Sequence, residues 1–180
     1  VGLLMTKKLT VGELPAGSQT LVGRWRLMLG KDAEACGVCM SPGGEGHEGE
    51  RAEAVRAARV AASAAQLFIS VHANSVDTTR GVLRVQGASA YYRHAQGRDL
   101  AAAIQRRMLQ HTGLTDFGLV GAFNYLPIRR ITHAPAVLVE QAFMSHPGDE
   151  ARMLDPSFRA RTAQAVRMGL EDFLRGTLAP

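Results

Sequence analysis

Residues 67–75 read Leu-Phe-Ile-Ser-Val-His-Ala-Asn-Ser, an apolar run that only Ser70 interrupts before His72. A nearly continuous apolar stretch of this length is typical of a strand covered on both faces, as the strands of parallel sheets are. Residues 135–143, Pro-Ala-Val-Leu-Val-Glu-Gln-Ala-Phe, repeat the pattern and place Glu140 after four apolar residues. We therefore predict two buried strands, each followed or closed by a polar side chain.

The segments around these runs alternate between helical and strand-like patterns. Residues 50–66 contain neither Gly nor Pro and carry small apolar residues at three- and four-residue steps, which predicts a helix. Further helices are expected at 98–112, before Gly113, and at 156–175, and further strands at 24–30, 82–85, 88–92 and 128–132. This alternation predicts an α/β fold, a single domain over residues 1–180 whose mostly parallel twisted sheet is flanked by helices.

Composition narrows the functional classes. A chain of 180 residues with 46% hydrophobic and 21% charged residues is an ordinary globular domain. Its net charge of +5 and pI of 9.8 favour polyanionic surroundings, such as nucleic acid, anionic lipid or an anionic cell wall. No Lys/Arg-rich run indicates nucleic-acid binding, no segment is apolar enough to span a membrane, and no signal-peptide pattern opens the sequence. The oligomeric state is left open.

The cysteines Cys36 and Cys39 form the spacing Cys-Gly-Val-Cys. Such a pair suits half of a zinc knuckle, a redox pair or a local disulfide. Because a structural zinc ion needs four ligands, the pair by itself predicts no more than packing or a local crosslink.

His72 and Glu140 are the polar residues that matter most in this pattern, because ligands of doubly wound sheets collect at the carboxyl ends of the strands. Burial of a carboxyl group at such a place raises its pKa toward the range that a general base needs near neutral pH. A neutral imidazole there is a natural zinc ligand. The alternative is structural, since a strand-end histidine or glutamate often serves only packing or a salt bridge.

The first of the two motifs resembles that of the zinc-dependent N-acetylmuramoyl-L-alanine amidases, which cut peptidoglycan between muramic acid and the stem peptide. In that family a helix carrying an Arg, here Arg56, leads into a strand that ends in Ser-(Ile/Val)-His-Ala-Asn. Residues 70–74, Ser-Val-His-Ala-Asn, match it. The resemblance implies that His72 is one of the zinc ligands.

The second motif of the family reads Pro-Ala-Val-Leu-Val-Glu, then Phe and a Ser-Asn-Pro-like turn with acidic residues. Residues 135–140, Phe143 and residues 145–150 follow it closely, and Tyr91-Tyr92 resemble its paired tyrosines. Arg130 fits an Arg that the family places before this strand. The resemblance covers residues 50–175 and implies an amidase-like, phosphorylase/hydrolase-type architecture.

From this resemblance we expect a peptidoglycan hydrolase of the cell envelope that uses one Zn²⁺ ion. It assigns Glu140 as the catalytic general base and acid, His72 as a metal ligand, and Asn74 and Arg130 as substrate-binding residues. Peptidoglycan is the expected partner.

Residues 1–49 depart from the family pattern, because neither its Asp-Pro-Gly-His-Gly-Gly motif nor its ligand-bearing Glu can be read there. We interpret them as a divergent or truncated front part. Glu13 and His47 are the candidate replacements for the missing ligands, although His47 falls after the expected second strand instead of before it. The alternative hypothesis is therefore a non-catalytic, metal-poor amidase-fold protein that binds cell-wall fragments or a partner.

Overall fold

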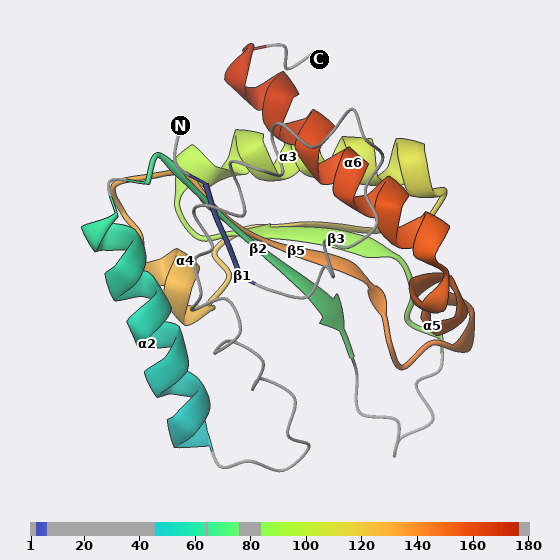
Figure 1. Cartoon of the computed structure of the whole chain (residues 1–180), viewed down its shortest axis with the longest axis horizontal. Coiled ribbons are helices and arrows are strands. Elements are labelled where there is room, and N and C mark those ends of the chain that lie inside the picture. Colours follow the sequence, from blue (N-terminus) through green and yellow to red (C-terminus); the bar gives the residue numbers. More distant parts are fainter. Residues whose placement is uncertain (1–2, 7–45, 64, 76–83, 177–180) are drawn as a thin grey trace.

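The sheet at the centre of the protein has five strands in the order β1-β2-β5-β3-β4 (Figure 1). The computed structural model describes residues 3–6, 46–63, 65–75 and 84–176. The strands are β1 (Leu3–Thr6), β2 (Leu67–Asn74), β3 (Ala88–Tyr92), β4 (Asp116–Val120) and β5 (Ala136–Phe143). Among these described strands only β3 and β5 pair antiparallel, so the sheet is mostly parallel, as predicted.

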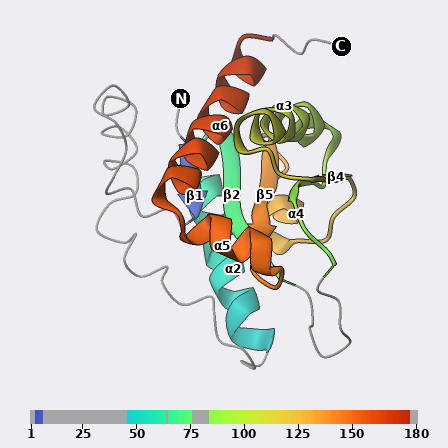
Figure 2. The ribbon, with the colours of Figure 1, turned by 90° about the vertical axis from the view of Figure 1, so that its right-hand side faces the viewer.

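Helices cover both faces of this sheet. On one face lie α3 (Ala95–Thr112) and α6 (Pro156–Leu174), which pack against each other, and on the other lie α2 (Gly46–Ala62) and α4 (Leu126–Arg130) (Figure 1). The remaining helix, α5 (Pro147–Leu154), follows β5 directly. Viewed from the side, β1, β2 and β5 lie next to one another in that order (Figure 2). The predicted α/β fold with flanking helices is confirmed.

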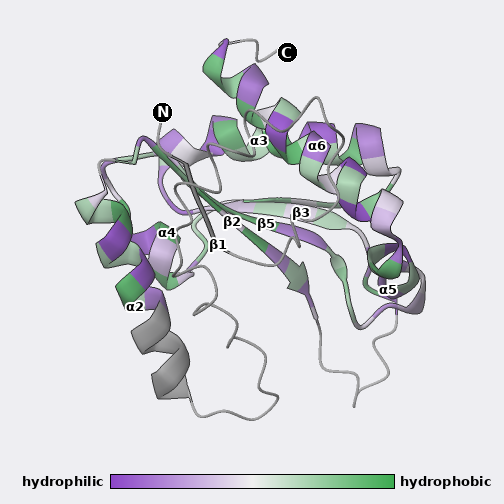
Figure 3. Ribbon diagram, in the orientation of Figure 1, coloured by the Kyte–Doolittle hydropathy of each residue, from purple (hydrophilic) through white to green (hydrophobic). Residues whose placement is uncertain are grey.

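Alternate residues of β2 and β5 enter two different cores. Leu67, Ile69 and Val71 belong to the cluster under α3 and α6, whereas Phe68 packs in the cluster under α2 and α4. The strand β2 is mainly hydrophobic until its last residues, while the helices mix hydrophilic and hydrophobic positions along their length (Figure 3). On the α2/α4 face, the continuation of this alternation reaches Ser70 and then His72.

Several predicted elements are observed with small shifts of their ends. The helix expected at 50–66 is α2, that at 98–112 is α3, and that at 156–175 is α6. Gly113 ends α3 with φ 64°, a left-handed conformation that glycine adopts without the steric cost other residues bear. The strand expected at 24–30 and the pair Cys36 and Cys39 lie outside the described residues.

The prediction of a strand at 128–132 is wrong, because α4 occupies most of that stretch. Pro127 lies in the first turn of α4, where its fixed φ favours a helix and its missing N–H costs nothing. Ile128 is buried within α4, and Ile131, the extended residue that caps the end of the helix, is buried as well.

A strand was also predicted at 82–85, of which the structure describes residues 84 and 85. Neither of these two residues is in a strand, so the prediction is wrong there. Three elements were missed. The first is β1, which lies in the front part of the chain, where no strand was expected before residue 24. The second is β4, an edge strand whose residues are largely exposed and include Gly118, so it lacks the apolar alternation of a buried strand. The third is α5, which begins at Pro147 within the turn expected after β5.

Candidate functional site

His72 and Glu140 are paired across two parallel strands. His72 on β2 is the register partner of Glu140 on β5, and on the other side Glu140 pairs with Ser89 of the antiparallel strand β3. Residues that pair across neighbouring strands direct their side chains to the same face of the sheet. The three polar residues therefore form a row on the α2/α4 face, where the apolar cluster under these helices ends.

Glu140 is a buried carboxyl group with little to compensate its charge. The residue is 8% exposed, and its Oε2 atom has no hydrogen-bond partner among the described residues. Burial alone raises the pKa of Glu140 from 4.5 to about 8, because the ionised form loses its hydration. A carboxyl group in this state can take up and release a proton near neutral pH.

His72 is held as a neutral imidazole. Burial lowers its pKa from 6.5 to about 4, with a further contribution from the positive charge of Arg56. Its Nε2 lies 2.8 Å from Ser70 Oγ, and its ring meets the ring of Tyr125 edge-on at 5.6 Å between centroids. The Gln141 amide donates to the His72 carbonyl oxygen, which ties the end of β2 to β5.

Three further buried side chains, those of Ser70, Tyr125 and Arg56, are connected to His72 by hydrogen bonds. The guanidinium of Arg56, on α2, donates through Nη1 to the Tyr125 hydroxyl at 3.3 Å, and Arg56 is 8% exposed. Tyr125 precedes α4 and also shares a hydrogen bond with Ser70. Burial raises the pKa of Tyr125, so the phenol stays protonated near neutral pH.

Asn74 and Tyr91 extend the site toward β3. Asn74 Nδ2 donates to the Tyr91 hydroxyl at 3.4 Å, and Ser89 Oγ donates to the same hydroxyl at 3.1 Å. The Tyr91 ring packs against Phe123, with 4.5 Å between centroids. Asn74, expected as a substrate-binding residue, thus lies at the end of β2 two residues beyond His72.

The other predicted site residues lie elsewhere or cannot be placed. Arg130 is exposed in the last turn of α4, and none of the described contacts joins it to His72 or Glu140. His47 is the second residue of α2, but its side chain lies outside the described part of the structure, as Glu13 does entirely.

Ser70, Ser89 and Tyr125 were not predicted as site residues. Ser70 carried one signal, since it is the only polar residue inside the apolar run before His72, and Ser89 and Tyr125 carried none.

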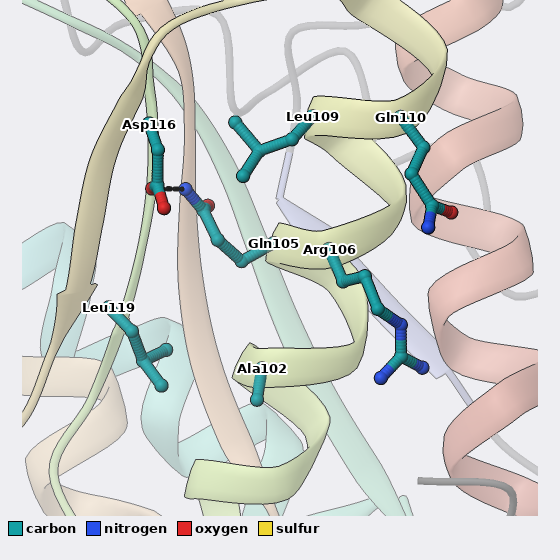
Figure 4. Close-up of a pocket in the computed structure, with 7 residues that line it drawn as sticks. All are labelled: Ala102, Gln105, Arg106, Leu109, Gln110, Asp116 and Leu119. Atoms are coloured by element: carbon teal, nitrogen blue, oxygen red, sulfur yellow. Dashed lines mark hydrogen bonds between the residues drawn. The ribbon is translucent and has the colours of Figure 1, made fainter. Parts of the chain in front are cut away.

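A groove of about 380 Å³ lies away from this site, between α3 and the edge strand β4. Its lining is Ala102, Gln105, Arg106, Leu109, Gln110, Asp116 and Leu119 (Figure 4). The one hydrogen bond drawn there joins Gln105 Nε2 to Asp116 Oδ1 at 2.7 Å (Figure 4). Gln105 Oε1 is buried and has no hydrogen-bond partner among the described residues. The groove is open and shares no residue with the row that contains Glu140.

Residues 44–172 match the N-acetylmuramoyl-L-alanine amidase family. The matched stretch includes both paired strands, β2 and β5. The chain belongs to this amidase family. Among curated amidases, LytC of Bacillus subtilis is 29% identical over 118 residues, which are 63% of this chain and 23% of LytC. The probable cell wall amidase LytH of Staphylococcus epidermidis is 29% identical over 106 residues, 59% of this chain and 34% of LytH. The chain thus spans about a quarter of the length of LytC and about a third of the length of LytH.

Solved amidase structures share the fold. The catalytic domain of CwlV, an N-acetylmuramoyl-L-alanine amidase from Bacillus (Paenibacillus) polymyxa var. colistinus, superimposes with a TM-score of 0.62 at 31% identity, covering 68% of this chain and 65% of that one. The CwlD amidase from Clostridioides difficile, solved in complex with the GerS lipoprotein, gives a TM-score of 0.66 over 97% of this chain and 98% of its own. Its 18% identity indicates a common fold alone.

Zinc is the metal on which this amidase family generally depends. His72 suits it, because a buried neutral imidazole keeps a lone pair for a metal. Within the described residues, however, no three His, Cys, Asp or Glu side chains lie together as a metal site would require. The described part of this amidase domain therefore fits one ligand of a zinc site and not the complete set.

None of the described helices combines the length and the apolarity needed to cross a bilayer.

Proposed function

We propose that this chain hydrolyses the amide bond between N-acetylmuramic acid and the L-alanine of the peptidoglycan stem peptide, with Glu140 as the general base and acid. The observation that carries the proposal is the pairing of His72 with Glu140 on parallel strands within a domain of the amidase family. The pKa of Glu140, which burial raises to about 8, supports its role in moving a proton.

The proton transfers follow from the position of Glu140. Its carboxylate takes a proton from the attacking water as the oxygen of that water bonds to the amide carbonyl carbon. The protonated carboxyl group then delivers this proton to the L-alanine nitrogen as the carbon–nitrogen bond breaks. One carboxyl group can do both because the proton that it takes in the first step is the proton that it gives back in the second.

A bound Zn²⁺ ion would supply Lewis-acid chemistry, which makes water a better nucleophile and the amide carbonyl group more electrophilic. We propose His72 as one ligand. Glu13 remains a candidate, and the end of β1, where Thr6 is paired with Ser70 of β2, lies seven residues before it in the sequence. His47 is the second candidate.

The substrate contacts are proposed on two grounds. Asn74 extends from the end of β2, near Tyr91 and the row that contains Glu140, where it could hold an amide of the stem peptide. Arg130 is exposed at the end of α4, where its charge suits a carboxylate of the substrate. The net charge of +5 would keep the enzyme on an anionic wall, and we place it in the cell envelope.

A second candidate function is a non-catalytic wall-binding domain of the same fold. It is favoured by the incomplete ligand set among the described residues, since zinc affinity depends on the number and geometry of the ligands.

The zinc content of the purified chain and its release of muropeptides from peptidoglycan distinguish the two functions. Stoichiometric zinc together with release supports the amidase. A metal-free chain that sediments with peptidoglycan but releases nothing from it, even with added Zn²⁺, supports the binding domain.

A further inference from the structure

Arg56 is an unusual residue for the position it occupies. The residue is only 8% exposed, and burying a guanidinium charge is costly unless its donors are used. It lies on α2, and its Nη1 donates to the hydroxyl of Tyr125. The cost of burying this charge indicates that the contact has a purpose beyond packing.

The contact continues as a chain of hydrogen bonds to His72. Tyr125 bonds to Ser70, which is completely buried on β2, and Ser70 Oγ lies 2.8 Å from His72 Nε2. The chain of hydrogen bonds thereby links α2 and the residue before α4 to one imidazole nitrogen on β2, which Ser70 contacts directly. The edge-on ring of Tyr125 restricts the rotation of the same imidazole from the side.

The chemistry of these groups fixes where the hydrogens lie when Nδ1 is free to bind a cation. A guanidinium only donates, so the Tyr125 oxygen is its acceptor. A neutral imidazole that offers Nδ1 carries its proton on Nε2, and Ser70 Oγ is placed to accept it. The Ser70 proton is then donated to the second lone pair of the Tyr125 oxygen. Each step uses a contact that is present.

We propose that Ser70, Tyr125 and Arg56 are positioning residues that hold the His72 ring in one orientation, with Nε2 protonated and Nδ1 presented to the site. The inference rests on the proposed function in that it takes His72 to be a metal ligand. It adds to that function by naming the residues that prepare the ligand, since groups bonded to the second nitrogen of a metal-binding histidine orient its ring.

The first test observes the imidazole itself in the metal-free 180-residue chain, labelled with ¹⁵N at histidine and treated with a chelator. In the wild type we expect a His72 Nε2–H signal that exchanges slowly with solvent, because Ser70 holds that proton in a buried hydrogen bond. Ser70→Ala should lose the signal, and Ser70→Thr, which keeps the hydroxyl, should retain it. A proton on Nδ1 in the wild type, or a protected Nε2–H in Ser70→Ala, overturns the proposal.

The second test measures zinc affinity by competition with a chelator. Ser70→Ala and Tyr125→Phe should bind Zn²⁺ about 10- to 100-fold more weakly than the wild type, the usual effect of losing a group that orients a ligand. Thr162→Val, which removes a buried hydroxyl on α6 away from the site, is the matched control and should bind as the wild type does. Unchanged affinity in both site variants overturns the proposal.

The two proposals fail in different ways. If the wild type shows the protected Nε2–H and the variants lose zinc affinity, but no muropeptide is released, then the amidase proposal fails and the positioning role stands. If the wild type releases muropeptides while both variants keep their zinc affinity, the positioning role fails and the amidase proposal stands.

Discussion

His72 and Glu140 occupy paired positions on the parallel strands β2 and β5, and burial shifts their pKa values in opposite directions. The imidazole is neutral because protonation would bury a positive charge, and the carboxyl group holds its proton because ionisation would bury a negative one. Adjacent groups of this kind offer a lone pair and an exchangeable proton side by side. This pairing is the basis of the predictions on activity and pH.

Glu140→Gln should lower the rate of muropeptide release by about 10²- to 10⁴-fold, the typical contribution of a general acid or base. The amide keeps the size of the side chain but cannot take a proton from water. Release is measured by chromatography of digested peptidoglycan, and the exposed Glu150→Gln on α5 serves as the control. A Glu140→Gln variant as active as the wild type would falsify the role of this carboxyl group.

The stability of the metal-free chain should fall as the pH rises from 6.5 to 8. With its pKa raised from 4.5 to about 8, Glu140 keeps a proton in the folded chain that the unfolded chain has lost, so its contribution is complete below pH 4.5 and is lost toward pH 8. His72, with its pKa lowered from 6.5 to about 4, acts oppositely and only below pH 6.5.

This pH effect has a maximum slope of about 1.4 kcal/mol per pH unit for one proton. Urea unfolding in the presence of a chelator measures it, and Glu140→Gln should remove it. If the variant and the wild type lose stability in parallel over this range, another group is responsible.

Gly169→Ala should destabilise the fold where α6 crosses α3. A Cβ atom at this position would lie 2.5 Å from Ile104 Cα and 2.8 Å from Ile104 N, which are backbone atoms that cannot turn away. Overpacking of this kind costs about 1–3 kcal/mol, against less than about 1 kcal/mol gained in helix propensity. Urea unfolding measures the loss, and the exposed Gln164→Ala on the same helix should stay near the wild type. Equal stability of both variants contradicts the close helix contact.

Asp149→Ala should cost about 3 kcal/mol of unfolding free energy. The Asp149 carboxylate, 3% exposed, accepts from the backbone N–H groups of Gly87 at 2.7 Å and Phe143 at 3.1 Å, and the alanine variant would leave both donors buried without it. Asp149→Asn keeps an oxygen that can accept and should lose less. Thermal or urea unfolding decides, with Glu150→Ala as the exposed control, and a neutral Asp149→Ala refutes the structural role.

The sequence predicts best where one physical effect dominates. The strands β2 and β5 could be predicted because burial on both faces demands an apolar run, and His72 and Glu140 interrupt or end these runs. The stretch around Ile128 was misread because a short apolar segment suits a strand or a helix equally, and Pro127 decided for the helix.

The remaining site residues depend on tertiary structure. Arg56 could be matched to a family motif, but its burial beside Tyr125 follows from how α2 lies on the sheet, which periodicity does not give. Tyr125 is 55 residues beyond Ser70, and no local pattern connects them. The resemblance supplied the family, and the structure supplied the contacts behind His72.

The two sides of the sheet differ in what a change to them would alter. The side beneath α3 and α6 is packed with apolar residues along β2, β5 and β3, so substitutions there would be felt chiefly as loss of folded protein. The opposite side, beneath α2 and α4, is also apolar along most of its described strands. Polar side chains replace apolar ones at the end where His72 is paired with Glu140. Substitutions at that end can therefore change the reactivity of the domain while its scaffold persists.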